Sequence, residues 1–127
     1  MEKLNCKSFM IGDWVVYNGD VEYINPIRVE GMDIATDMLI TSDREDVGFE
    51  GVEPIPLTLK ILDKNGFRAG IYGNIVMMEK GVSFSLIKGY EGDFWWTCRG
   101  EPIVKIKFVH ELQHALRLCG IKKGIEL

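Results

Sequence analysis

The segment 103-IVKIKFVHELQHALRLCGI-121 changes its hydrophobic period partway along, and this change decides the fold class. Residues 103–108 alternate apolar side chains with lysines, which is typical of a strand with one face in water. Apolar side chains then recur at helical spacing on a single stripe made up of Val109, Leu112, Ala115, Leu116 and Cys119. Gly120 ends this helix, and Ile121 is expected to fold back in a Schellman contact. A strand that leads directly into an amphipathic helix predicts an α+β fold.

The sequence upstream of this segment predicts a helix followed by an antiparallel sheet. Thr58 is the expected N-cap of a short helix that ends at Asn65-Gly66. Hairpin-length loops then separate four expected strands, at Ile71–Met78, Val82–Ile87, Phe94–Cys98 and Ile103–Phe108. The order is therefore helix, four-stranded meander and C-terminal helix.

The N-terminal part of the chain predicts short strands without a helix. The expected strands are 9–17, 21–27, 33–40 and 49–54, with a hairpin turn at Asn18-Gly19-Asp20 and a break at Gly31. This pattern is typical of a small SH3-like β-barrel or a curled sheet. Two prolines in Glu53-Pro-Ile-Pro-Leu-Thr58 mark a boundary between modules 1–56 and 57–127. A single compact domain is the alternative.

Composition limits the classes of partner. The chain has 127 residues, of which 46% are hydrophobic and 27% charged, so it can bury a core without disulfides. Residues 1–56 carry 12 acids and 4 bases, whereas residues 57–127 carry 7 acids and 11 bases. The acidic half argues against general nucleic-acid affinity. No apolar stretch is long enough for a membrane span, and three widely spaced cysteines, Cys6, Cys98 and Cys119, predict reduced thiols in the cytoplasm.

The two histidines of the chain stand four residues apart in His110-Glu111-Leu-Gln-His114. This string matches the H-E-x-x-H pattern of zinc peptidases and resembles the helix of a zincin. In a minimal zinc-dependent hydrolase, His110 and His114 would be the metal ligands and Glu111 the general base. Both histidines are expected on the helix face opposite the apolar stripe, toward solvent or a partner.

A third zinc ligand is not evident in the sequence. Only 13 residues follow His114, and Arg117 stands where a Gly-x-x-His extension needs glycine. A ligand from the acidic loop, such as Asp43 or Asp46, is the remaining option. We therefore expect a polar helix face without a cofactor, and keep the zinc hydrolase as the alternative function.

An aromatic cluster lies in Gly89-Tyr-Glu-Gly-Asp-Phe-Trp-Trp-Thr97. Side chains alternate across a strand, so Trp95 and Trp96 should point to opposite faces of the sheet. Exposed aromatic residues commonly mark binding surfaces. We predict partner binding through Trp95, Trp96 and Tyr90; packing of both faces is the alternative.

One resemblance adds to these patterns. The string 109-VHELQHALRLCGI-121, together with Glu53-Pro-Ile-Pro-Leu-Thr58, Lys64-Asn-Gly-Phe67 and the strand at Gly12-Asp-Trp-Val15, resembles a group of small uncharacterised proteins of gut anaerobic bacteria and their mobile elements. These proteins share a Val-His-x-Leu-Gln string but often lack the second histidine, which implies that the H-E-x-x-H match is fortuitous. The expected function is that of a non-enzymatic interaction or accessory protein that binds another protein, or alternatively a nucleic acid, through the aromatic sheet or the polar helix face.

Overall fold

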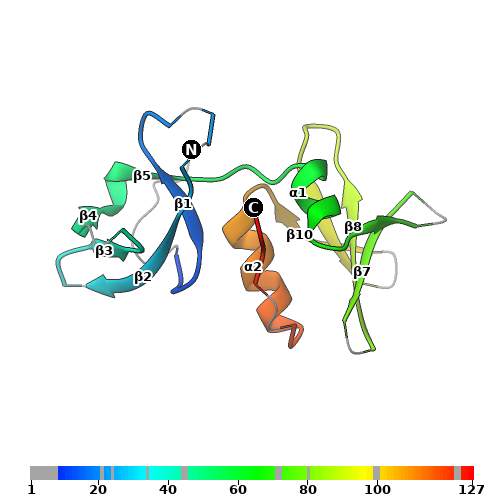
Figure 1. Cartoon of the computed structure of the whole chain (residues 1–127). Helices are drawn as coiled ribbons and strands as arrows, with labels where there is room; N and C mark the ends of the chain where they lie inside the picture. The colour runs from blue at the N-terminus through cyan, green and yellow to red at the C-terminus, as the bar shows by residue number, and fades with distance from the viewer. Residues whose placement is uncertain are drawn as a thin grey trace. The chain divides into compact units, whose positions relative to one another are not determined.

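The chain folds into two compact units, residues 1–55 and 56–127, each built around an antiparallel five-stranded sheet (Figure 1). The structure is a computed structural model that describes residues 9–20, 22–23, 25–33, 35–43, 46–70, 73–79, 81–98, 101–121 and 124–127. Sheets and two α-helices make the fold α+β, as the sequence predicts. Cys6 and the expected strand starts at Val21 and Ile71 lie outside the described residues.

Within its described residues, the first unit consists of one sheet and a 3₁₀ turn. Its strands are β1 (Trp14–Tyr17), β2 (Ile27–Asp33), β3 (Met38–Thr41), β4 (Asp46–Gly48) and β5 (Val52–Pro54), with the turn η2 (Phe49–Gly51) before β5. The sheet order is β4-β3-β2-β1-β5. The edge strands β4 and β5 form no ladder with each other in the described part of the chain, so the sheet is open. The core consists of Phe9, Val15, Ile27, Val29, Leu39 and Val52.

The predicted positions of the second and third strands of this unit were wrong: β2 spans Ile27–Asp33 and β3 spans Met38–Thr41. Gly31 lies inside β2 instead of ending a strand, next to a bulge that begins at Val29. A Cβ at Gly31 would lie 3.2 Å from the Cδ1 atom of Ile40 on β3. The glycine therefore makes room for a cross-strand neighbour, and β2 continues to Asp33.

The second unit follows the predicted order with one added strand. Its elements are α1 (Leu59–Lys64), β6 (Arg68–Ala69), β7 (Ile75–Glu79), β8 (Val82–Lys88), β9 (Phe94–Cys98), β10 (Glu101–Ile106) and α2 (Val109–Leu118). The sheet order β10-β9-β8-β7-β6 is a meander. Within the described residues of the expected strand 71–78, β7 begins at Ile75, after Gly73 with its φ of +78°.

The sheet of the second unit has one packed and one open face. Phe84, Leu86 and Phe94 point to the packed face, where each is at most 2% exposed. Both helices lie on this side (Figure 1), and Phe67, just after α1, meets the Phe84 ring edge-on at 6.2 Å. Ser85 and Ile87 alternate with these residues along β8 and are half-buried on the other face.

Caps at the C-terminus of α2 and at the N-terminus of α1 form as the sequence predicts. The N–H of Ile121 donates to the Leu116 carbonyl at 2.9 Å, and the N–H of Gly120 donates to the Arg117 carbonyl at 3.0 Å, which together form a Schellman motif. Thr58 caps α1 by accepting a hydrogen bond from the N–H of Ile61 at 3.3 Å.

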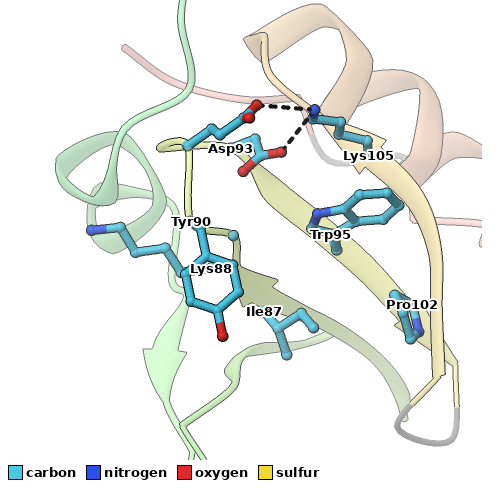
Figure 2. A pocket seen from close by; sticks show the side chains of 9 residues that line it. Ile87, Lys88, Tyr90, Asp93, Trp95, Pro102 and Lys105 are labelled. Carbon is cyan, nitrogen blue, oxygen red and sulfur yellow. Dashed lines mark ion pairs between the residues drawn. The ribbon is translucent and has the colours of Figure 1, made fainter.

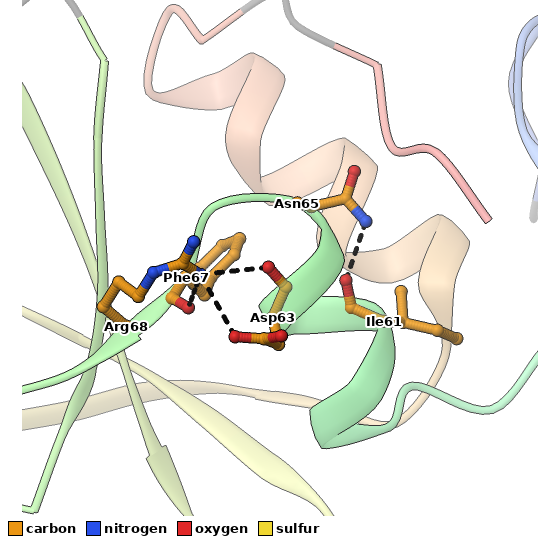
Figure 3. A network of polar contacts seen from close by, with 5 residues as sticks. All are labelled: Ile61, Asp63, Asn65, Phe67 and Arg68. Atoms are coloured by element: carbon orange, nitrogen blue, oxygen red, sulfur yellow. Dashed lines mark hydrogen bonds and ion pairs between the residues drawn. The ribbon is translucent and has the colours of Figure 1, made fainter.

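Side chains strengthen the end of α1 (Figure 3). Asn65 donates to the Ile61 carbonyl at 2.7 Å, and Arg68 donates to the backbone and side chain of Asp63. Asn65 also exchanges two hydrogen bonds of 2.7 Å with the backbone of Glu126, which fixes the C-terminal segment beside α1.

Within the described ranges, neither helix is long and apolar enough to cross a membrane.

Candidate functional site

The two adjacent tryptophans of β9 have different environments. Trp96 lies on the packed face and stacks on Phe84, with ring centroids 5.3 Å apart and planes at 19°. Trp95 pairs with Ile87 on β8 and Lys105 on β10, and it lies half-buried on the open face. The predicted split of the two side chains is confirmed. Trp96 belongs to the packed side of the sheet and is not brought to the candidate site.

Trp95 borders an open groove of about 390 Å³ on this face (Figure 2). The groove runs from the β8–β9 hairpin across β9 to the edge strand β10. Tyr90, at the tip of the hairpin, is fully exposed beside it. The structure thus brings Trp95 and Tyr90 to one site, whose lining residues are Ile87, Lys88, Gly89, Tyr90, Glu91, Asp93, Trp95, Pro102 and Lys105.

An ion-pair network closes one end of the groove. The Nζ atom of Lys105 lies 3.2 Å from Oδ2 of Asp93 and 3.6 Å from Oε2 of Glu91. The Asp93 side chain is only 6% exposed, whereas that of Glu91 is 79% exposed. The contact of Lys105 with the buried Asp93 carboxylate is therefore the stronger part of the network, since solvent weakens the ion pair with the exposed Glu91.

The pKa values of this pair are shifted in opposite directions. Desolvation is the largest influence on Asp93 and acts to raise its pKa, but the hydrogen bond from Lys105, its positive charge and nearby backbone N–H groups together lower the pKa below its ordinary value. The hydrogen bond to Asp93 in turn raises the pKa of Lys105. Both groups are charged at neutral pH, and each neutralises the other.

A glycine makes the burial of Asp93 possible. Gly89 and Asp93 enclose a three-residue hairpin loop, and the N–H of Gly89 donates to the Asp93 carbonyl at 2.8 Å. A Cβ at Gly89 would lie 2.1 Å from Oδ1 of Asp93 and 3.3 Å from Nε1 of Trp95. The carboxylate thus fills the space of a missing side chain, and within the described residues its buried Oδ1 has no hydrogen-bond partner.

The β6–β7 hairpin has the same construction. Gly70 donates to the Asn74 carbonyl at 2.7 Å, and a Cβ at Gly70 would lie 2.1 Å from Oδ1 of Asn74. The third loop residue is a glycine of positive φ in both hairpins, Gly73 and Gly92. Sequence analysis missed this relation, although Gly-x-x-Gly followed by Asn or Asp occurs twice, 19 residues apart. The first hairpin ends in Asn74, whereas the second ends in an acid, Asp93. Asp93 pairs with Lys105 on the neighbouring strand β10.

The two histidines of α2 are less exposed than the sequence predicts. His110 is 4% exposed, its ring stacks on Phe108 with centroids 5.9 Å apart, and His114 meets it edge-on at 5.5 Å. Gln113 on the same side of α2 is also 4% exposed. The expectation that both histidines point toward solvent or a partner was wrong for His110, which packs against Phe108, whereas His114 is half-buried.

Glu111 serves the helix as a cap in this structure. Its Oε1 atom accepts hydrogen bonds of 3.0 Å from the backbone N–H groups of Lys107 and Phe108. These bonds satisfy donors at the start of α2 and place a negative charge at its N-terminus. A general base must instead direct its carboxylate to a metal-bound water.

The described residues contain no cluster of three His, Cys, Asp or Glu side chains suited to hold a metal ion. Asp43, considered above as a third ligand, accepts hydrogen bonds of 2.8 Å from the Tyr17 hydroxyl within the first unit. The geometry therefore gives the zinc alternative no support beyond the sequence match itself.

Comparison with known proteins assigns no family. The chain matches no protein-family model, and neither a curated protein nor a solved structure is detectably similar to it. The candidate site therefore has to be judged on its own chemistry.

Replacing Glu111 tests its capping role. We expect Glu111→Ala to lower the unfolding free energy by about 1 kcal/mol, the usual effect of losing a helix cap, whereas Glu111→Gln loses less because an amide oxygen also accepts the two bonds. Urea unfolding, with and without added zinc, measures both variants. Stabilisation of the wild type by zinc that disappears in His114→Ala would instead support the metal site.

Replacing Gly89 tests how the groove is held. The new Cβ of Gly89→Ala would overlap the Asp93 carboxylate and force it away from Lys105, so we expect destabilisation by about 1–3 kcal/mol, typical of an overpacked site. Gly124→Ala is the matched control, because nothing lies within 4 Å of its Cβ position. Equal unfolding free energies for the two variants would show that Asp93 does not occupy the space beside Gly89.

Proposed function

We propose that this chain is a non-enzymatic accessory protein that binds a protein partner through the groove beside Trp95 and Tyr90. One observation carries the proposal: a fully exposed tyrosine and a half-buried tryptophan flank one groove on the open face of a sheet. Tyr and Trp are enriched at the centres of protein interfaces, since they add large contact areas and lose little conformational entropy.

The charges of the groove favour a protein over a nucleic acid. Asp93 and Glu91 both stand beside Lys105, so the charged end of the groove carries no net positive charge. Binding of a phosphate backbone requires clustered and available Lys or Arg side chains. With Lys88, the lining carries two positive and two negative charges, and Lys105 is already paired with Asp93, so the groove lacks the cluster of available cations that a phosphate backbone needs.

The rigidity of the groove is consistent with recognition. Its aromatic side chains come from a strand and a tight hairpin whose loop is closed by the Gly89–Asp93 hydrogen bond. A preformed site loses less free energy to ordering when a partner binds. A cytoplasmic location and an origin in a bacterial mobile element complete the proposal; they rest on the reduced cysteines expected from the sequence and on the resemblance to small proteins of gut anaerobes.

Selection from a random peptide library displayed on phage tests this function. We expect the immobilised chain to enrich peptides that bind the wild type and lose roughly tenfold or more in affinity for Trp95→Ala or Tyr90→Ala, since each variant removes a central aromatic contact. Met78→Ala is the control, because this side chain is 69% exposed on the same sheet face but does not line the groove. Peptides that bind all three variants equally, or no enrichment at all, would contradict the proposal.

A further inference from the structure

We infer that the occupant of this groove is a proline-rich segment in the polyproline II conformation. The inference rests on the proposed function and specifies the chemistry of the partner. Three properties of the described residues support it: the balance of donors and acceptors in the groove, the arrangement of its apolar side chains, and the construction of the neighbouring edge strand.

The groove offers hydrogen-bond donors, while its buried acceptors are occupied or enclosed. The indole Nε1–H of Trp95 makes no hydrogen bond within the described part of the chain and points to the side where Tyr90 and Asp93 lie (Figure 2). Asp93 is paired with Lys105 through Oδ2, and its Oδ1 is enclosed against Gly89. A proline residue has a carbonyl acceptor and no N–H donor. A proline-rich segment therefore supplies carbonyl acceptors for the Trp95 N–H, and its prolines have no N–H donor that would be left unsatisfied.

The apolar surfaces suit a ridged, extended chain. Trp95, Tyr90 and Pro102 border one open groove and leave space between their rings (Figure 2). A polyproline II helix has three residues per turn and no internal hydrogen bonds, so its rings project outward and its carbonyls remain free. Docking of such segments into grooves lined by aromatic side chains is a recurring mode of peptide recognition, and the stiff ligand loses little entropy.

The edge strand β10 is poorly suited to the main competing mode, in which a peptide adds a strand to the sheet. Pro102 cannot donate a backbone hydrogen bond, and the pairing of β10 with β9 shifts register between Pro102 and Val104. Proline and bulges in edge strands discourage pairing with another strand. A peptide is therefore recognised more readily by the side chains of the groove than by the backbone of β10.

Sugars and nucleobases fit the groove less well than a proline-rich segment. A sugar presents several hydroxyl donors, and among the lining carboxylates only that of Glu91, which is 79% exposed, is open to accept them. A nucleobase would stack on Trp95, but of the two lining lysines Lys105 is already paired with Asp93, which leaves only Lys88 for its phosphate. Both ligand classes are used as competing probes below.

Nuclear magnetic resonance of the ¹⁵N-labelled full chain, titrated with octaproline, tests the inference. We expect saturable shifts of the Trp95 indole N–H signal, which Trp95→Phe identifies by its loss. A peptide of alternating glycine and serine of equal length should cause none. Trp95→Phe keeps an aromatic ring but lacks the donor, so it should weaken octaproline binding roughly three- to tenfold. Tyr90→Ala should weaken it by roughly tenfold or more, and Met78→Ala should leave it within about twofold.

The contrary outcomes separate the inference from the proposed function. Selected peptides without proline that bind through Trp95, combined with no response to octaproline, would overturn the inference and leave the protein-binding function standing. Saturation by cellohexaose or by an oligothymidylate, without a response to octaproline, would overturn the inference and replace the protein partner with that ligand class. Absence of any response at Trp95 to octaproline and to the peptide library would overturn both.

Discussion

The open face of the second unit depends on one ion pair, that of the buried Asp93 carboxylate with the half-buried Lys105. A buried carboxylate is costly unless it is paired, and here the pairing joins the β8–β9 hairpin to β10 across the end of the groove. The pair also requires Gly89, because any Cβ at this position would occupy the space of the carboxylate. Strand pairing, hairpin geometry and charge thus act together where Trp95 and Tyr90 line one groove.

The contrast between two similar hairpins shows what is specific about this site. Both hairpins enclose three residues between a glycine and an Asn or Asp whose side chain fills the space beside the glycine, so this construction alone does not define the site. In the first, the amide of Asn74 donates to the Ser85 hydroxyl at 3.2 Å and needs no counter-ion. In the second, the acid is paired with Lys105 and the loop carries an exposed tyrosine. The acid at the end of the second hairpin and its lysine partner are thus what distinguish this site.

Local patterns in the sequence were sufficient for the helices, the meander and the opposite faces of Trp95 and Trp96. Capping residues such as Thr58 and Gly120 act within a few residues, so their effect is visible without a structure. The role of Gly31 was not predictable in this way, because it depends on Ile40 across the sheet. The same holds for the Asp93–Lys105 pair, which is set by strand register, and for His110, whose burial reflects tertiary packing. Glu111 was considered as a catalytic base, although its position three residues after the helix start is also typical of a cap.

Titration of the Asp93 carboxyl by ¹³C nuclear magnetic resonance tests the central claim most directly. Desolvation acts to raise the pKa of Asp93, but attraction from Lys105 prevails, so the account predicts a midpoint below the ordinary aspartate value of about 3.9 and a higher midpoint in Lys105→Met. Because the folded-state pKa is lowered, the pair stabilises the fold above about pH 4, and this stabilisation is lost as the pH falls through the folded-state pKa. A midpoint at or above the ordinary value, unchanged in Lys105→Met, would show that the ion pair does not hold the groove.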